Sequence, residues 1–236
     1  MSRDERPASA VPSWILVLLA TSLAGQVAWQ AARGSAALTA SDLPPAPAAG
    51  ALRAASLGEP AAGARLAMIW LQGFDLRGGN VARYRELDYA RLVAWLRQIL
   101  ATDPRSNYPL FAAARVYAEV EDAARARLVM RFVHEAYLED PDRRWPWLAH
   151  AAFLAKHRLK DLALARRYAH DIDRLTTDAS VPLWAKQMEI FILEDMNELE
   201  AARVMLGGLL ASGRVRDPAE RRFLEQRLQE IERRIR

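Results

Sequence analysis

An aspartate recurs at near-regular intervals over the C-terminal part of this chain, and it constrains the fold more than any other feature. It stands at Asp103, Asp140, Asp178 and Asp217, at spacings of 37, 38 and 39 residues, and a proline follows all of them except Asp178. A fixed period of about 20–50 residues is the signature of repeat proteins, in which each unit stacks on its neighbours. The period predicts units at 67–103, 104–140, 141–178 and 179–217.

Each unit has the pattern of a pair of helices. Apolar residues recur at i, i+3, i+4 and i+7, which is the helical period, and no useful stretch alternates with the period of a strand. Pro109, Pro146 and Pro182 each precede an apolar or aromatic pair, and proline suits the first position of a helix. The pattern predicts an all-α fold in which each of these prolines begins the first helix of its unit.

Large and small residues recur at matching places in adjacent units. Trp147 lies 18 residues before Ala165, and Trp184 lies 18 residues before Ala202. A large side chain on one helix that faces a small one on the next favours close packing of an antiparallel pair.

With these positions the chain resembles the tetratricopeptide repeat (TPR) family over roughly 67–217. The family pattern has a large residue early in the first helix, a small residue near its middle, an aromatic or large residue one turn later and an alanine in the second helix. One unit matches these positions with Leu110, Ala114, Tyr117 and Ala126, and the next matches them with Trp147, Ala151, Leu154 and Ala165. In the third match Met188 stands in the place of the small residue, and Ala179 stands where proline is expected. The resemblance implies a right-handed α-solenoid of about four helix-turn-helix units over 65–217. A bend or a change in binding is expected near Asp178.

The chain after Asp217 predicts a capping helix over 218–236. Asp217-Pro218 is a helix start signal, and Leu224, Leu228, Ile231 and Ile235 form one apolar stripe among Glu and Arg residues. A solenoid needs such a terminal helix with a polar outer face. In the preceding unit, Gly207-Gly208 indicates a close contact between helices or a break, and the close contact is favoured.

The N-terminal segment is the longest stretch without an ionisable side chain. After a short tail at 1–10, residues 11–32 would span roughly 33 Å as a helix, enough for a bilayer core of about 30 Å. The segment predicts one transmembrane helix, with a cleaved signal peptide and a buried soluble helix as alternatives. Arg3 and Arg6 favour a cytoplasmic N-terminus. The expected location is the inner membrane of a bacterium, single-pass, with most of the chain periplasmic. Residues 33–64, rich in Ala and Pro, predict a linker with little packed structure.

Composition argues against several other functions. The chain has no cysteine, which excludes disulfides and thiolate sites, and its four histidines show no strong metal spacing. The net charge is +4, but arginines are interspersed with acids rather than clustered as in nucleic-acid binders. No nucleophile or acid–base motif is assembled. We therefore expect no enzyme, no cofactor, no metal and no nucleic acid.

The expected function is a membrane-anchored scaffold or adaptor in the assembly of an envelope or membrane complex. The alternative is a dedicated structural subunit of one such complex. By the family resemblance, a partner segment would enter a concave groove lined by 108–119, 145–156 and 183–194. The candidate partner-binding residues are Tyr108, Arg115, Trp145, Lys156 and Lys186. Trp145 is singled out because Trp and Arg are typical interface hot spots.

Overall fold

The computed structural model describes residues 12–32, 43–75 and 81–236. The chain divides into two compact units, Met1–Thr39 and Ala40–Arg236. In the first unit the described part is essentially one helix, α1 (Ser13–Ala32), whose large apolar side chains are exposed.

The prediction of a transmembrane helix at 11–32 is wrong. None of the described helices is long and apolar enough to cross a membrane. In α1, polar residues such as Thr21, Ser22 and Gln26 interrupt the apolar sequence and lower its mean hydropathy. The expected single-pass location in the inner membrane, with a periplasmic domain, depended on that helix and is not supported. The expected N-terminal tail, 1–10, lies outside the described residues.

The second unit is a succession of helices, and its described residues contain no strand. The helices are α2 (Ala49–Ala55), α3 (Pro60–Gln72), α4 (Tyr89–Thr102), α5 (Tyr108–Arg115), α6 (Ala123–Glu139), α7 (Pro141–His157), α8 (Leu162–Leu175), α9 (Leu183–Lys186), α10 (Met188–Asp195), α11 (Leu199–Ala211) and α12 (Pro218–Ile235). Two 3₁₀ helices, η3 (Val81–Glu86) and η4 (Tyr117–Glu119), precede α4 and α6.

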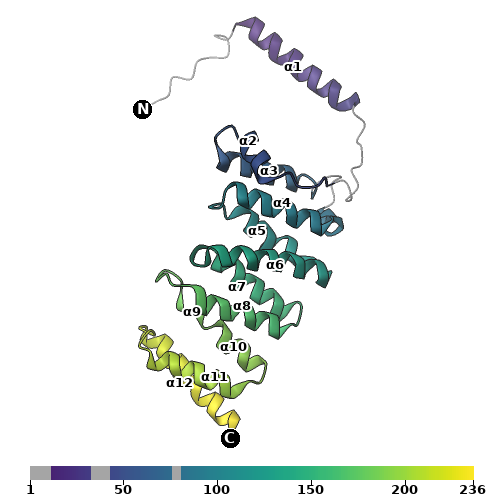
Figure 1. The fold of residues 1–236 in the computed structure, drawn as a ribbon. Helices are drawn as coiled ribbons and strands as arrows, with labels where there is room; N and C mark the ends of the chain where they lie inside the picture. The colour runs from purple at the N-terminus through teal and green to yellow at the C-terminus, as the bar shows by residue number, and fades with distance from the viewer. Residues whose placement is uncertain (1–11, 33–42, 76–80) are drawn as a thin grey trace, which may run out of the picture. The chain divides into compact units, whose positions relative to one another are not determined.

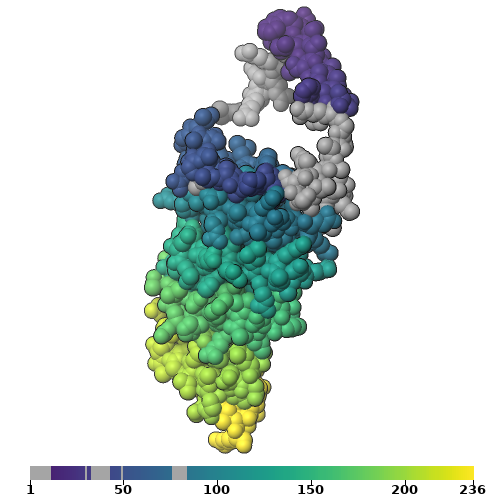
Figure 2. Space-filling view, turned by 45° about the vertical axis from the view of Figure 1, so that its right-hand side comes forward, coloured from purple at the N-terminus to yellow at the C-terminus, as the bar shows by residue number. Residues whose placement is uncertain are grey.

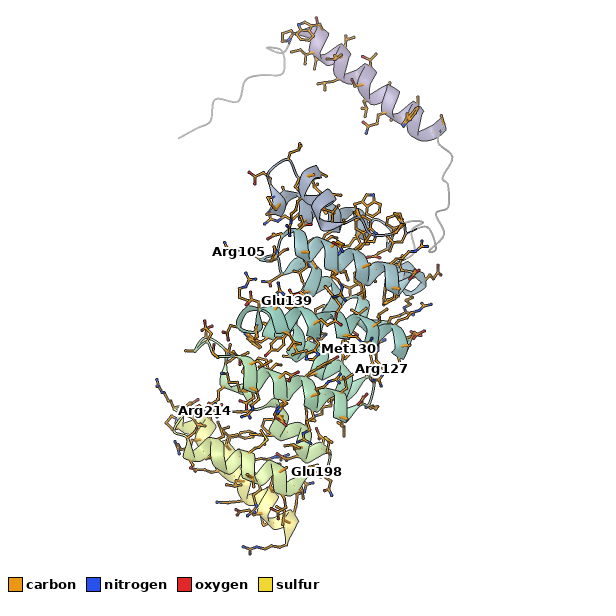
Figure 3. The ribbon with its side chains drawn as sticks, viewed as in Figure 1. Arg105, Arg127, Met130, Glu139, Glu198 and Arg214 are labelled. Atoms are coloured by element: carbon orange, nitrogen blue, oxygen red, sulfur yellow. The ribbon has the colours of Figure 1, made fainter. Side chains whose placement is uncertain are left out.

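Helices that follow one another in the chain pack against one another. The pairs are α3/α4, α5/α6, α7/α8 and α10/α11, with α12 packed on α11. Within this unit they stack in chain order (Figure 1), so the surface is made of successive bands (Figure 2). Arg105 and Arg214, from connections, and Glu139, the last residue of α6, lie along one edge of the stack, and Arg127 and Glu198 lie along the other (Figure 3). This is the arrangement of antiparallel helix pairs, and it is compatible with a helical repeat fold.

Aspartates cap the second helices of three pairs. Asp88 Oδ1 accepts from the backbone N–H groups of Ala90 and Arg91 at the start of α4. Asp122 caps α6 in the same way, and Asp161 Oδ1 accepts from Leu164 N at 2.9 Å at the start of α8. A carboxylate at this position satisfies backbone donors that lack a partner within the helix. A second set of aspartates, distinct from the recurring set, therefore marks the starts of these second helices.

The recurring aspartates lie between the pairs, but the prolines act differently from the prediction. Helices α7 and α12 begin at Pro141 and Pro218, directly after Asp140 and Asp217. The prediction that Pro146 begins a helix is wrong, because this residue lies inside α7. Proline disturbs a helix least in its first turn, and here the helix tolerates a second proline one turn further along.

Two arginines at the start of α7 link this pair to the one before. Arg144 is 3% exposed, and its guanidinium donates to the carbonyl oxygens of Ala136 at 2.6 Å and Pro104 at 3.0 Å. Arg143 Nη2 also donates to Pro104 O, at 2.9 Å. A buried guanidinium is tolerated only when its donors are occupied. These bonds fasten the first turn of α7 to the connection before α5 and to the end of α6.

The apolar core falls into two clusters. The N-terminal cluster runs from Leu43 to Ile192 and includes the buried alanines of α5 and α7. The C-terminal cluster is smaller and consists of Ile190, Leu193, Ala202, Leu206, Leu209, Val215, Leu224 and Ile231. Helix α10 contributes to both clusters, so the division falls on the unit that matches the family pattern least.

The structure differs from the expected unpacked linker at 33–64. Residues 33–42 lie outside the described part, but Leu43 is fully buried and α2 packs on α4. Arg91 Nη1 donates to Leu43 O at 2.7 Å, and Trp95 Nε1 donates to Pro44 O at 2.8 Å. The buried residues of the described part of this segment are Leu43, Ser56 and Ala64, whereas most of its alanines are exposed.

The close contact expected at Gly207-Gly208 is also wrong. A Cβ placed on either glycine would meet nothing within 4 Å, and α11 continues through both. The glycine that does permit a close approach is Gly63 of α3, where a Cβ would lie 1.8 Å from Ser56 Oγ. Its spacing from Ser56 gave no signal of this contact, because the contact depends on the turn between α2 and α3.

Candidate functional site

A cleft of about 380 Å³ opens on helices α5, α7, α9 and α10, the first helices of three adjacent pairs. This size lies at the lower end of the range for ligand pockets, about 300–1,000 Å³. The lining residues come from four helices and are mostly apolar. They are Arg115, Trp145, Pro146, Ala149, His150, Phe153, Trp184 and Met188.

An interruption of the first helix shapes one wall of this cleft. Helix α9 ends at Lys186 and α10 begins at Met188, with the buried Gln187 between them. The amide of Gln187 donates to Glu220 Oε1 on α12 at 2.9 Å. The residue at the break is therefore held in place by α12. Met188 occupies the place where the repeat pattern has a small residue. Its side chain is partly buried against the core and lines the cleft.

Two tryptophans from consecutive pairs form the aromatic part of the cleft. The ring centroids of Trp145 and Trp184 are 5.4 Å apart and meet edge to face at 73°. Trp184 is 54% exposed. Edge-to-face pairs are favourable, but an indole this exposed retains much apolar surface in contact with water.

A third aromatic side chain lies about two turns further along α7. Phe153 is 51% exposed, and its ring centroid lies 4.4 Å from that of His157 and 6.1 Å from that of His150. With the two tryptophans it makes an exposed apolar surface of helical spacing. Such surfaces are a property of interaction sites more than of isolated domains.

The polar part of the cleft is an arginine–histidine pair. Arg115 Nη1 lies 3.2 Å from His150 Nδ1. A guanidinium can only donate, so Nδ1 must accept, and the neutral imidazole then carries its proton on Nε2. Burial and, next, the charge of Arg115 hold the pKa of His150 below its usual value, although Glu119 opposes this. The charged group of the cleft is therefore Arg115, beside a neutral imidazole.

The far side of His150 faces a carboxylate that is already engaged. His150 Nε2 is 3.7 Å from Glu119 Oε1, too far for a hydrogen bond. Glu119 Oε2 accepts instead from Arg158 Nη1 at 2.8 Å. Glu119 is thus neutralised by Arg158 rather than by Arg115.

The structure brings two of the five predicted site residues together, Arg115 and Trp145. The phenol of Tyr108 donates to Gln72 Oε1 and borders a separate cleft with Arg65 and Arg105. Lys156 pairs with Asp195, and Lys186 Nζ donates to Thr176 O at 2.9 Å. The roles of these five residues in binding stay predictions.

Trp184, Phe153 and His150, the other aromatic residues of the cleft, are not among the five predicted site residues. Trp184 was assigned to helix packing by the family pattern, and Phe153 and His150 carried no separate signal. Both spans that contain them, 145–156 and 183–194, were expected to face the groove. The exposure of Trp184 could not be predicted, because it follows from the interruption of the helix at Gln187.

A second cleft lies on helices α8, α10 and α11. It has a volume of about 500 Å³ and contains the carboxylate of Glu189, whose side chain is 2% exposed. Both oxygens of this carboxylate are occupied, by Arg166 Nε at 3.2 Å and His170 Nδ1 at 2.9 Å. A carboxylate held in this way serves packing between helices.

Within the described residues, no group of three or more His, Cys, Asp or Glu side chains could hold a metal ion. Comparisons of the chain with protein-family models, with curated proteins and with solved structures found no match.

Proposed function

We propose that this chain is a TPR-like scaffold that binds a short segment of another protein in the cleft of Arg115, Trp145, Phe153, Trp184 and Met188. The observation that carries the proposal is the pair Trp145–Trp184, with Trp184 54% exposed, in a cleft made by successive first helices. Burying such a side chain on binding removes a large apolar area from water.

Burial at the repeat positions supports the TPR-like part of the proposal. The small residues Ala114 and Ala151 are fully buried, as are the alanines of the second helices, Ala165 and Ala202. Small side chains at these places allow the two helices of a pair to approach. The same residue types recur at the same depth in successive pairs, as in a repeat array.

Selection from a library of peptides displayed on phage, with the full chain as bait, tests the proposal. We expect enriched peptides whose binding weakens about 30-fold or more in Trp184→Ala, the effect of losing a hot spot of about 2 kcal/mol. Phe223→Ala is the matched control, since Phe223 is 55% exposed on α12, away from the cleft. Equal binding to the parent and to Trp184→Ala would refute the site.

A further inference from the structure

The cleft carries one positive charge that no carboxylate in the described part of the chain neutralises. The one hydrogen-bonding partner of the Arg115 guanidinium there is His150, at 3.2 Å. Two other cations near the cleft are paired, Lys156 with Asp195 and Arg158 with Glu119. Arginine stays protonated at any physiological pH. The rim of an apolar cleft is therefore left with an uncompensated cation.

The geometry of Arg115 suits the capture of a carboxylate. The contact with His150 uses one of five guanidinium donors, so the others remain for an incoming group. It also restrains a long side chain beside the cleft, and less conformational freedom is then lost on binding. Guanidinium–carboxylate pairs are frequently bidentate, with two parallel hydrogen bonds.

The rest of the cleft is suited to an apolar side chain next to that carboxylate. Trp145, Trp184 and Phe153 offer aromatic faces, and Met188 offers an adaptable wall. A volume of about 380 Å³ suits one or two side chains rather than a whole helix.

We propose that the occupant of the cleft is an internal acidic segment of a partner protein, with an Asp or Glu side chain on Arg115 and a neighbouring apolar side chain between Trp145, Trp184 and Phe153. The inference rests on the proposed function and names the chemistry of its ligand. Capture of a chain terminus commonly uses free backbone N–H groups. Trp145, Ala149 and His150 lie within α7, where backbone N–H groups are engaged in the helix. A side-chain carboxylate is therefore favoured over a terminal one.

Two peptide libraries test this chemistry. In the first, random decamers are inserted between two folded domains, so that neither end is free. In the second, the same decamers end in a free carboxylate. With the full chain as bait, we expect the first library to enrich Asp or Glu beside Leu, Met or Phe. With Arg115→Gln the acidic enrichment disappears while the apolar enrichment persists. The matched control, Arg131→Gln on the exposed face of α6, behaves as the parent.

The selected sequence then provides a quantitative test with a synthetic peptide whose ends are acetylated and amidated. Replacement of its acidic residue by the amide is expected to weaken binding to the parent about tenfold, and binding to Arg115→Gln less than twofold. Apolar enrichment without acidic enrichment, or enrichment confined to free C-termini, overturns the inference and leaves the proposed function standing. No enrichment from either library overturns both.

Discussion

At the scale of single residues, Asp75 links the stability of the fold to pH. This residue is 9% exposed, and Tyr117 donates to its Oδ2 atom at 2.7 Å. Burial raises the pKa of Asp75 from 3.8 to about 6, and the hydrogen bond from Tyr117 opposes the rise. The folded state therefore binds this proton more tightly than the unfolded state. Its contribution to stability is present below pH 3.8 and is lost as the pH rises through 6.

Replacement of Asp75 by asparagine is expected to raise the free energy of unfolding at pH 7.5. At about 1.4 kcal/mol for each tenfold change in proton affinity, the gain is at most about 3 kcal/mol. It should largely vanish near pH 4, where Asp75 of the folded parent protein is protonated and neutral. Urea denaturation at the two pH values measures this, with Asp173→Asn as a control. A gain of the same size at both pH values would contradict the assignment.

Lys160 has a backbone conformation that costs free energy. Its φ is 54°, in the turn between α7 and α8, and Asn197 has a φ of 60° in the turn between α10 and α11, 37 residues later. Asparagine tolerates this conformation better than lysine. We expect Lys160→Gly to raise the free energy of unfolding by about 0.5–1 kcal/mol. Arg131→Gly, at an exposed position midway along α6, should lower the free energy of unfolding by about 1 kcal/mol. Denaturation curves of the two variants should therefore move in opposite directions.

At the scale of the helix, the glycines of α11 and α3 have opposite roles. Gly207 and Gly208 have open space around them, so alanine gains helix propensity without a clash. We expect Gly207→Ala and Gly208→Ala each to stabilise the chain by up to about 1 kcal/mol. Gly63→Ala should destabilise it, because the added methyl would meet the Ser56 side chain. Thermal unfolding followed by circular dichroism compares the three, and a rise in Tm for Gly63→Ala would show that α2 is not held against α3.

The helical type of the elements could be predicted from the sequence, because it depends on local signals. The Asp-Pro start of α12 is an example, and so is the apolar stripe that buries Leu224 and Ile231, whereas α7 begins at Pro141, five residues before the predicted Pro146. The burial of Leu43 and the break at Gln187 depend on residues distant in sequence, Trp95 on α4 by way of its bond to Pro44 and Glu220 on α12. The cleft could not be predicted for the same reason, because the exposure of Trp184 follows from the break at Gln187. The spans that line the cleft could be predicted from the repeat pattern, but the way in which they come together could not.

At the scale of the whole molecule, the two apolar clusters meet at α10, a helix that carries a buried charge. Glu194 on α10 has a side chain 3% exposed, with Arg227 Nε donating to Oε1 at 3.1 Å and Arg227 Nη2 2.6 Å from Oε2. This pair joins α12 to α10. Arg227 is itself 35% exposed and Arg234 Nη1 lies 4.0 Å from the same carboxylate, so removing Arg227 is expected to cost less than the roughly 3–5 kcal/mol of a fully buried pair.

Arg227→Ala is expected to loosen the C-terminal cluster before the N-terminal one. Native-state hydrogen exchange should show the protection of amides in α10–α12 falling while that in α4–α8 persists. The double variant Glu194→Leu/Arg227→Met should recover most of the loss, because it removes both charges at once. Equal loss of protection in all helices of Arg227→Ala would mean that the two clusters unfold as one.

The division of the core also bears on how the chain would respond to a pulling force. The larger cluster spans several helix pairs, and α7 is fastened to the preceding pair by Arg143 and Arg144 through Pro104 O. The buried residues of the smaller cluster lie on α10, α11 and α12 and at Val215. Stretched between residue 43 and Arg236, the chain would lengthen in two steps: the C-terminal helices would extend at the lower force, while the wall of the cleft formed by α5 and α7 would still bear the load.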